Sequence, residues 1–190
     1  MKFDELNKLE SYYKVMEIPE SEKKKRVELA QGLFDAFYFI LATMKIDKDI
    51  DREFYINSLK GRVIDTIGDY HYDPEYVDMI TEEVIDTTLR HLDDEYYFSP
   101  ERALLISQNE SNSILNNDDF RVAKEKGFTF KEWVAQMDER TRLEHVEVDH
   151  MKIPIDEYFY VGHDRMLFPH DTLNGSAENL INCRCVCHYT

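Results

Sequence analysis

The segment Asn182-Cys183-Arg184-Cys185-Val186-Cys187-His188 is the most distinctive part of this 190-residue chain. It contains all three cysteines, and five of the seven histidines lie at or after position 145. Cysteine and histidine are the residue types of metal sites and of nucleophilic chemistry. We therefore expect the characteristic part of the fold to form around the C-terminus.

Zinc binding is one interpretation of these cysteines, because thiolates and imidazoles are common zinc ligands and about four of them complete a tetrahedral site. The candidate ligands are Cys183, Cys185, His145 and His170. However, the Cys-x-Cys-x-Cys spacing aligns the sulfurs along one face of an extended strand, which suits a single ion only if the chain bends. The favoured interpretation is that the cysteines are small buried residues of a closing strand without a metal.

The composition is that of a soluble globular chain. Hydrophobic residues make up 43% of it, enough for a core, and its length suits one large domain or two small ones. The most apolar run, residues 33–44, falls far short of the ~20 residues that span a bilayer, so it is predicted to be a buried helix. No cationic and apolar leader is evident at the N-terminus. We therefore expect a protein of the cytosol with no membrane partner.

The net charge of −16 limits the partners further. An acidic surface repels phosphate, which argues against sequence-specific binding of nucleic acid. The one dense basic run, Lys23-Lys24-Lys25-Arg26, is predicted to be the solvated face of a helix. The acidity suits docking onto a basic surface of a partner protein.

The pattern of apolar residues predicts an α+β fold, in which a helical bundle (residues 1–99) precedes a small, loop-rich α+β domain (residues 100–190). The predicted helices of the first part are 3–16, 21–46 with Ser21 as N-cap, 50–69, and 74–95 with Asp73 as N-cap and Pro74 at the first position. In the second part, helices are predicted at 100–117 and 118–126, the latter ending at Gly127. Residues 145–149 alternate in the manner of a short strand, and extended segments and turns are expected at 151–169.

Two further groups of residues have both a structural and a catalytic interpretation. The segment 138–145, Asp-Glu-Arg-Thr-Arg-Leu-Glu-His, contains acids and bases, but we favour a network of ion pairs and hydrogen bonds that fixes a loop-rich fold. Glu110 lies within a helix and is either exposed or turned inward, where it would need Arg140 or Arg142 as partner. The sequence contains no G-x-S-x-G, P-loop, G-x-G-x-x-G or H-E-x-x-H motif.

The order of these pieces resembles the C-terminal domain of phage head morphogenesis proteins of the Mu F-like and SPP1 gp7-like family. The resemblance covers about residues 100–190 and rests on D-E-R-T-R-x-x-H followed by N-C-R-C. Asp149-His150 stands where the family often has Asp-Gly. The matching positions are Glu110, Trp133, Asp138, Arg140, Arg142, His145, Asp149, Asn182, Cys183, Arg184 and Cys185, and the resemblance implies a structural role for them.

The resemblance also implies a function. Members of the family are minor capsid proteins of tailed phages or prophages; they bind the portal, capsid or scaffold proteins, lie inside the virion, and assemble in the host cytoplasm. Ejection with the DNA is part of that expectation. Two alternatives stay open. One is an enzyme, an ADP-ribosyl- or nucleotidyl-transferase or a hydrolase, that uses Glu110, Arg140, His145 and Cys183. The other is a zinc-stabilised binding module.

Overall fold

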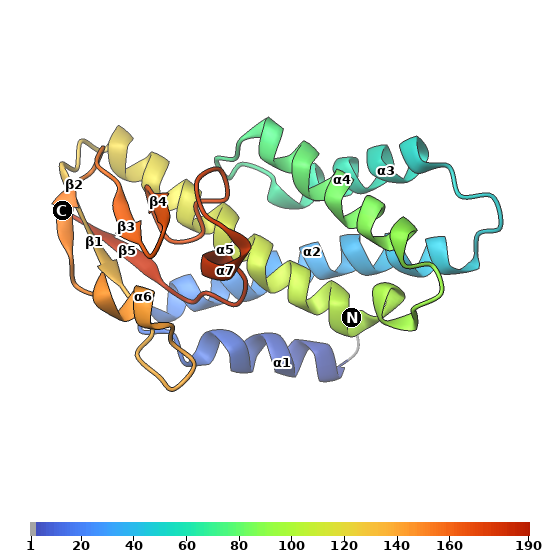
Figure 1. Ribbon diagram of the computed structural model, residues 1–190, viewed down its shortest axis with the longest axis horizontal. Coiled ribbons are helices and arrows are strands. Elements are labelled where there is room, and N and C mark those ends of the chain that lie inside the picture. The colour runs from blue at the N-terminus through green and yellow to red at the C-terminus, as the bar shows by residue number, and fades with distance from the viewer. Residues whose placement is uncertain (1–2) are drawn as a thin grey trace.

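The computed structural model describes residues 3–190 and has a helical part at one end and small sheets at the other (Figure 1). The helices are α1 (Phe3–Lys14), α2 (Glu20–Ile46), α3 (Arg52–Ile67), α4 (Pro74–Arg90), the 3-10 helix η1 (Glu95–Phe98), α5 (Pro100–Glu125), α6 (Leu143–Glu147) and α7 (Ala177–Leu180). The strands are β1 (Phe130–Val134), β2 (Lys152–Pro154), β3 (Phe159–Val161), β4 (Asp164–Met166) and β5 (Val186–Tyr189). The predicted α+β class is confirmed.

Local signals in the sequence set several helix ends. The side chain of Asp73 accepts a hydrogen bond from the backbone N–H of Glu75, with Pro74 at the start of α4. Ser99 caps α5 in the same way. At the other end of α5, Gly127 has a φ of 77°, and its N–H donates to the carbonyl of Lys124. The N–H of the next residue, Phe128, donates to the carbonyl of Ala123. These two bonds form a Schellman motif, which explains why a glycine stands there.

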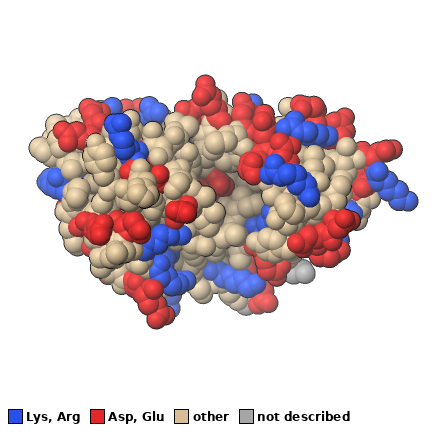
Figure 2. Space-filling model, viewed as in Figure 1, with Lys and Arg blue, Asp and Glu red and all other residues tan. Residues whose placement is uncertain are grey.

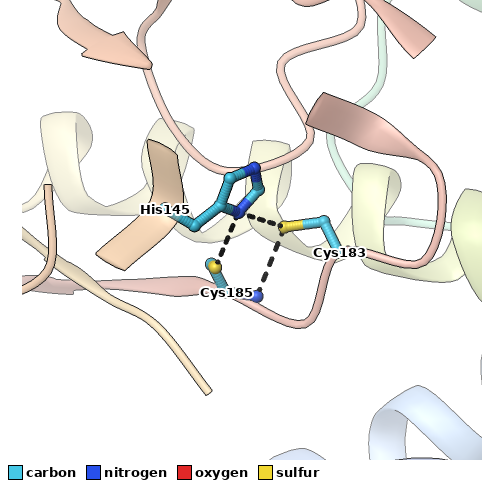
Figure 3. Close-up of side chains that lie close together, drawn as sticks. All are labelled: His145, Cys183 and Cys185. Atoms are coloured by element: carbon cyan, nitrogen blue, oxygen red, sulfur yellow. Dashed lines mark hydrogen bonds between the residues drawn. The ribbon is translucent and has the colours of Figure 1, made fainter. Parts of the chain in front are cut away.

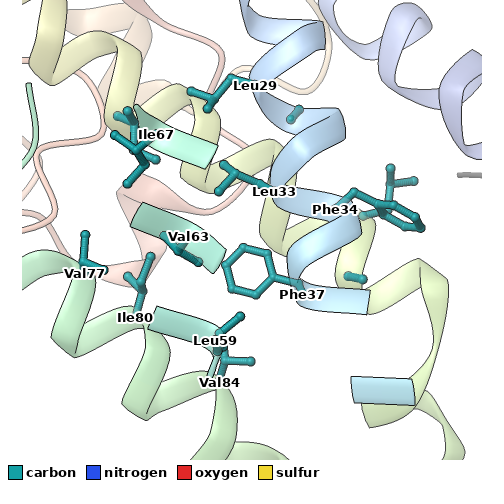
Figure 4. Packing of buried hydrophobic residues seen from close by; sticks show 14 of the residues in the cluster. Leu29, Leu33, Phe34, Phe37, Leu59, Val63, Ile67, Val77, Ile80 and Val84 are labelled. Carbon is teal, nitrogen blue, oxygen red and sulfur yellow. The ribbon is translucent and has the colours of Figure 1, made fainter. Parts of the chain in front are cut away.

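The helical core is built on α2. Figure 4 shows Leu33 and Phe37 of α2 pointing toward Leu59 and Val63 of α3, with Val84 of α4 close by. By length and composition alone α2 could also cross a membrane. In the structure its apolar side chains are packed against neighbouring helices, which is the arrangement of a core helix.

The strands form two small antiparallel sheets. In the larger sheet β1 lies between β2 and β5, with Glu132 opposite Lys152 on one side and His188 on the other. In the smaller sheet β3 pairs with β4. The larger sheet therefore joins the C-terminus to the segment that directly follows α5.

Three sequence-based expectations about elements are wrong. The predicted helices 100–117 and 118–126 are a single helix, α5, because Phe120 continues its buried face and packs against Phe168 at 5.1 Å between ring centroids. Residues 145–149, predicted as a strand, belong mostly to α6; its buried residue His145 stands three positions before the buried C-cap residue Val148, a helical spacing. Ser21 lies inside the first turn of α2, which begins after Pro19 without a side-chain cap.

The helix α5 connects the two parts of the chain. In Figure 1 it runs diagonally from the helical part to the sheets, and it packs against α2. The largest apolar cluster includes Leu33 of α2, Leu115 of α5 and Val186 of β5, so it extends across the predicted division at residues 99 and 100. The division into two domains stays a prediction.

Candidate functional site

The N-C-R-C segment and the D-E-R-T-R segment are joined by an ion pair. Arg184 Nη2 donates to Asp138 Oδ1 at 2.8 Å, and Arg184 Nη1 lies 2.8 Å from Asp138 Oδ2. The hydrogen bond from Arg184, supported by the backbone N–H of Arg140, holds the pKa of the Asp138 carboxyl well below its usual range. Arg142 donates to the carbonyl of Ile181 at 2.7 Å. The segment 138–142 therefore contacts the C-terminal segment through an ion pair and a hydrogen bond; the structural role of these residues stays a prediction.

Asparagines on α5 hold the other side of the C-terminal segment. The contacts are Asn182 N to Asn109 Oδ1 (2.7 Å), Asn112 Nδ2 to the Cys183 carbonyl (3.2 Å) and Asn116 Nδ2 to the Cys185 carbonyl (3.2 Å). The asparagines are three and four residues apart, so they share one face of the helix. They supply the hydrogen bonds that residues 182–185, which lie outside any strand, lack from a sheet.

Arg26 orients two of these asparagines from the opposite side. Its guanidinium is 1% exposed and donates to Asn112 Oδ1 at 2.9 Å and to Asn116 Oδ1 at 2.8 Å, with Asp119 3.7 Å away. Each amide oxygen is thereby occupied, so each amide nitrogen is directed at the C-terminal segment. The expectation that Arg26 lies on a solvated face with its lysine neighbours is wrong, because this side chain is drawn into the core by buried polar partners.

His145, Cys183 and Cys185 meet in a buried triangle (Figure 3). His145 Nδ1 lies 3.3 Å from Cys185 Sγ and 3.6 Å from Cys183 Sγ. The backbone N–H of Cys185 also donates to Cys183 Sγ at 3.4 Å. Cys183 and Cys185 precede β5, and Asn182 adopts a φ of 60°, so the chain bends here. The prediction that both cysteines belong to the closing strand is therefore wrong, and of the three only Cys187 lies on it.

Asn179 fixes the orientation of the His145 ring. Asn179 Nδ2 donates to the carbonyl of Val161 and to Asp164, at 3.0 and 2.8 Å, so its Oδ1 is free to accept. That oxygen lies 3.3 Å from His145 Nε2. Because Oδ1 can only accept, the network favours the tautomer with the proton on Nε2, in which the lone pair of Nδ1 faces the two sulfurs.

The two thiols of the triangle titrate differently. Burial raises the pKa of the Cys183 thiol, but hydrogen bonds from Cys185 and the positive charges of Arg142 and Arg184 outweigh it and lower the pKa overall. The hydrogen bond to Cys183, together with burial, raises the pKa of Cys185 well above its usual value. Cys183 is thus the member of the pair that ionises first.

A cysteine, a histidine and an asparagine in hydrogen-bonding order are also the parts of a nucleophilic site. Such a site must open to a substrate, but Cys183 and Cys185 are each 3% exposed and His145 is 2% exposed. The cavity beside them measures about 10 Å³, the space of one water molecule. The triangle in this conformation therefore has no room for a substrate.

Glu110 lies outside the triangle of His145, Cys183 and Cys185. Its Oε2 is buried and has no hydrogen-bond partner within residues 3–190, and burial raises the pKa of the carboxyl to about 8. Arg140 and Arg142 bind other groups, so the expected pairing with Glu110 is wrong. Glu110 lines a groove between α4, α5 and residues 170–181, on a face that Figure 2 shows to be hollowed near its middle. The structure thus separates Glu110 from Arg140 and His145.

His170 contacts the backbone of the C-terminal segment rather than the sulfurs. Its Nε2 lies 2.7 Å from the carbonyl of Cys183, and its Nδ1 lies 3.4 Å from Ser113 Oγ. The same carbonyl accepts from Tyr12 and Asn112. With both ring nitrogens engaged, His170 is not placed to bind a metal beside the cysteines. Burial lowers its pKa to about 4, so the ring is neutral near pH 7.

The remaining predicted residues hold the loops around the triangle. Trp133 is fully buried and packs edge-on against His145, with ring centroids 5.8 Å apart. Asp149 Oδ1 accepts from the backbone N–H of Ala135 at 2.8 Å. The next residue, His150, has a φ of 58°, in the left-handed region that glycine adopts most readily. The turn expected at Asp149-His150 is present.

Sequence reasoning missed the polar residues outside the two motifs, above all Arg26, Asn112, Asn116 and Asn179. A signal existed for the asparagines of α5. Asparagine is a poor residue for a helix interior, and several of them on one face indicate a role for their side chains. Arg26 gave no such signal, because a basic residue next to three lysines near the start of a helix is normally solvated.

Comparison with known proteins gives two matches. The profile of the family described as Phage Mu protein F like protein matches residues 79–188, more than half of the chain. The chain is also similar to a protein of Enterococcus faecalis (strain ATCC 700802 / V583) named NAD(+)--arginine ADP-ribosyltransferase EFV, with 31% identity over 100 residues. That match covers 50% of this chain and 20% of the length of the relative. No solved structure matches.

Proposed function

Because this chain belongs to the family of phage Mu protein F-like proteins, a phage head morphogenesis family, we propose that it is a minor capsid protein. Its role is structural: it binds the portal or the inner surface of the capsid during assembly in the host cytoplasm, remains inside the virion, and leaves with the DNA. The observation that carries this proposal is the family match over residues 79–188, which includes α5, its asparagine contacts to the C-terminal segment and the Asp138–Arg184 pair.

The predicted signature residues support a structural role by what they touch. Asp138 and Arg184 pair with each other, Arg142 and Asp149 bind backbone groups, and His145 lies buried against the two cysteines. Side chains that are occupied in this way stabilise a loop-rich fold. We infer that they are retained for the stability of the domain, and that the partner-binding surface lies elsewhere.

We place that surface on the acidic helical part. The groove of Glu110 has acidic residues along α4, among them Glu82, Glu83 and Asp86, beside the apolar side chains of Met79 and others. A basic and partly apolar segment of the portal or capsid protein has the complementary chemistry.

The relative named as an ADP-ribosyltransferase supports an enzymatic function less strongly than the family match supports a structural one. Only 20% of that protein is matched, and the activity in its name belongs to the whole protein. A transferase or hydrolase needs its acid, base and nucleophile at one accessible cleft. Glu110 lines the groove, whereas Arg140 and His145 line the cavity of about 10 Å³ beside the triangle.

The test is the composition of particles from the phage or prophage that encodes the chain. We expect mass spectrometry to find the protein in purified procapsids and virions, in fewer copies than the major capsid protein. We also expect it to co-purify with the portal protein. Its absence from both kinds of particle would overturn the proposal.

The binding surface has its own test. Glu82→Lys reverses one charge on the groove wall and should weaken co-purification with the portal protein. Glu157→Lys makes the same change at an exposed position of the C-terminal part and serves as the control. Equal binding by the two variants would remove the groove from the proposal.

A further inference from the structure

The spacing of the buried triangle is that of a metal site. The three possible ligand atoms, His145 Nδ1, Cys183 Sγ and Cys185 Sγ, all lie within 4.8 Å of one another. A zinc ion with tetrahedral angles, about 2.3 Å from sulfur and about 2.0 Å from nitrogen, places these atoms roughly 3.5 Å apart. The two nitrogen–sulfur distances are 3.3 and 3.6 Å. These two distances fit one ion that is bound by the nitrogen and by both sulfurs.

We propose that His145, Cys183 and Cys185 bind one zinc ion, which ties α6 to the bend before β5. This site needs the bend that the sequence did not reveal. Because Asn182 turns the chain, Cys183 and Cys185 point to one place instead of lying in a row along a strand. The third cysteine, Cys187, stands on β5 and takes no part.

The surroundings of His145 support metal binding. A histidine that binds zinc usually donates its other ring N–H to an oxygen, which fixes the tautomer and the orientation of the ring. Asn179 Oδ1 is that oxygen for His145 Nε2, and Val161 and Asp164 hold the Asn179 amide in place. The lone pair of Nδ1 is thereby presented to the centre of the triangle.

Gln136 is placed to supply or hold the fourth ligand. Its Oε1 is buried and has no hydrogen-bond partner among the described residues. It lines the same cavity as His145, Cys183 and Cys185, and that cavity measures about 10 Å³. Either this oxygen or one water molecule bound to it would complete a tetrahedron. An ion would give this buried oxygen a partner.

Charge and ligand type favour zinc over other common ions. Binding releases two thiol protons to solvent, and the two thiolates then balance the charge of Zn²⁺, while His145 stays neutral. A buried neutral site is the condition under which an ion can lie in a protein interior. Two thiolates and an imidazole are soft and borderline ligands, which Mg²⁺ and Ca²⁺ do not prefer. Since the site is closed to substrates, the ion would stabilise the fold rather than catalyse.

The test is the metal content of full-length protein purified without chelators. We expect about one zinc per chain in the wild type and in Cys187→Ser, and loss of this zinc in Cys183→Ser and Cys185→Ser. Cys187→Ser is the matched control, since it removes a thiol from the same segment but outside the triangle. Zinc absent from the wild type even after incubation with zinc salt would overturn the proposal. Zinc retained equally by all variants would identify adventitious binding and would overturn it as well.

A second measurement covers variants that do not fold. Wild-type protein is stripped with a chelator, and cobalt is added as a spectroscopic probe. We expect the absorption bands of tetrahedral cobalt with thiolate ligands, in the wild type and in Cys187→Ser. We also expect the melting temperature of the stripped protein to rise when zinc is restored. A spectrum of cobalt with oxygen ligands only, or an unchanged melting temperature, would contradict the site.

Discussion

The guanidinium of Arg184 lies against the carboxylate of Asp138, with two nitrogen–oxygen distances of 2.8 Å. Arg184 is almost fully buried and belongs to the N-C-R-C segment, whereas Asp138 opens the D-E-R-T-R segment. The pair therefore joins the two motifs that stand out in the sequence. Each motif thus supplies the charged partner of a residue in the other.

Asp138→Asn should lower the free energy of unfolding by about 1–3 kcal/mol, because it leaves the Arg184 charge without its partner. Chemical denaturation at neutral pH measures the change. Asp156→Asn is the control, since Asp156 forms an exposed pair with Lys124 and such pairs contribute less than about 1 kcal/mol. Equal effects of the two variants would contradict a special role for the buried pair.

The Asp138–Arg184 pair also predicts how the free energy of unfolding changes at acid pH. Arg184 holds the pKa of Asp138 below its value in the unfolded chain, near 3.8. The stabilisation is therefore complete above that value and is lost as the pH falls through the lower, folded-state pKa. The wild type should lose more stability than Asp138→Asn when unfolding is compared at neutral pH and at a pH below 3.8. A constant difference between the two proteins would count against this linkage.

Arg26→Met should destabilise the protein by about 3 kcal/mol or more. The substitution leaves the amide oxygens of Asn112 and Asn116 without their donor inside the core. Lys24→Met, on the same helix at an exposed position, is the matched control and should have an effect within about 0.5 kcal/mol. Urea denaturation of both variants provides the comparison. A mild effect of Arg26→Met would mean that the asparagines need no orienting partner.

Glu110→Gln should make the protein more stable above pH 4.5. Burial keeps the folded carboxyl protonated up to about pH 8, while in the unfolded chain it ionises near 4.5. In that window the unfolded state binds fewer protons, so the wild type loses up to about 1.4 kcal/mol per pH unit. Glutamine does not titrate, so the advantage of the variant should grow to about pH 8 and then stay constant. Thermal unfolding across this range tests the prediction, with the exposed Glu139→Gln as control.

His150→Gly should leave the stability within about 1 kcal/mol of the wild type, whereas His150→Val should lower it by about 1–3 kcal/mol. The φ of 58° is easy for glycine and strained for a β-branched residue. The hydrogen bond of 2.8 Å between the exposed His150 and Glu132 is lost in both variants, so their difference isolates the backbone. Calorimetric melting of the two variants would refute the idea if they behaved alike.

The long helices α1 to α4 could be located from sequence, and the reason is local; α6 was predicted as a strand and α7 was not predicted. The capping side chain of Asp73, the glycine after α5 and the apolar spacing of α2 all act over one or two turns. The errors have the opposite cause. The run Asn116-Asn117-Asp118-Asp119 weakens a helix locally, but contacts of Phe120 with Phe168 keep α5 continuous.

The candidate site was predictable only as a set of residues. The order of D-E-R-T-R-x-x-H and N-C-R-C identified Asp138, Arg184, His145 and the cysteines as members of one group. The order of the motifs did not reveal which of these residues contact one another. Glu110 was expected to be either exposed or paired with Arg140 or Arg142, but it lies in a separate groove, and its buried Oε2 has no hydrogen-bond partner among the described residues.

The sequence by itself determined the helix positions, the acidic charge and the family, since these depend on neighbouring residues or on the order of motifs. Only the tertiary structure decided that Arg26 is buried and that Cys183 and Cys185 converge on His145. Those contacts join residues separated by 86 and 90 positions for Arg26 and by 38 and 40 positions for His145. Such pairs form because packing of α2, α5 and the C-terminal segment brings them together, and no local rule of the sequence encodes that packing.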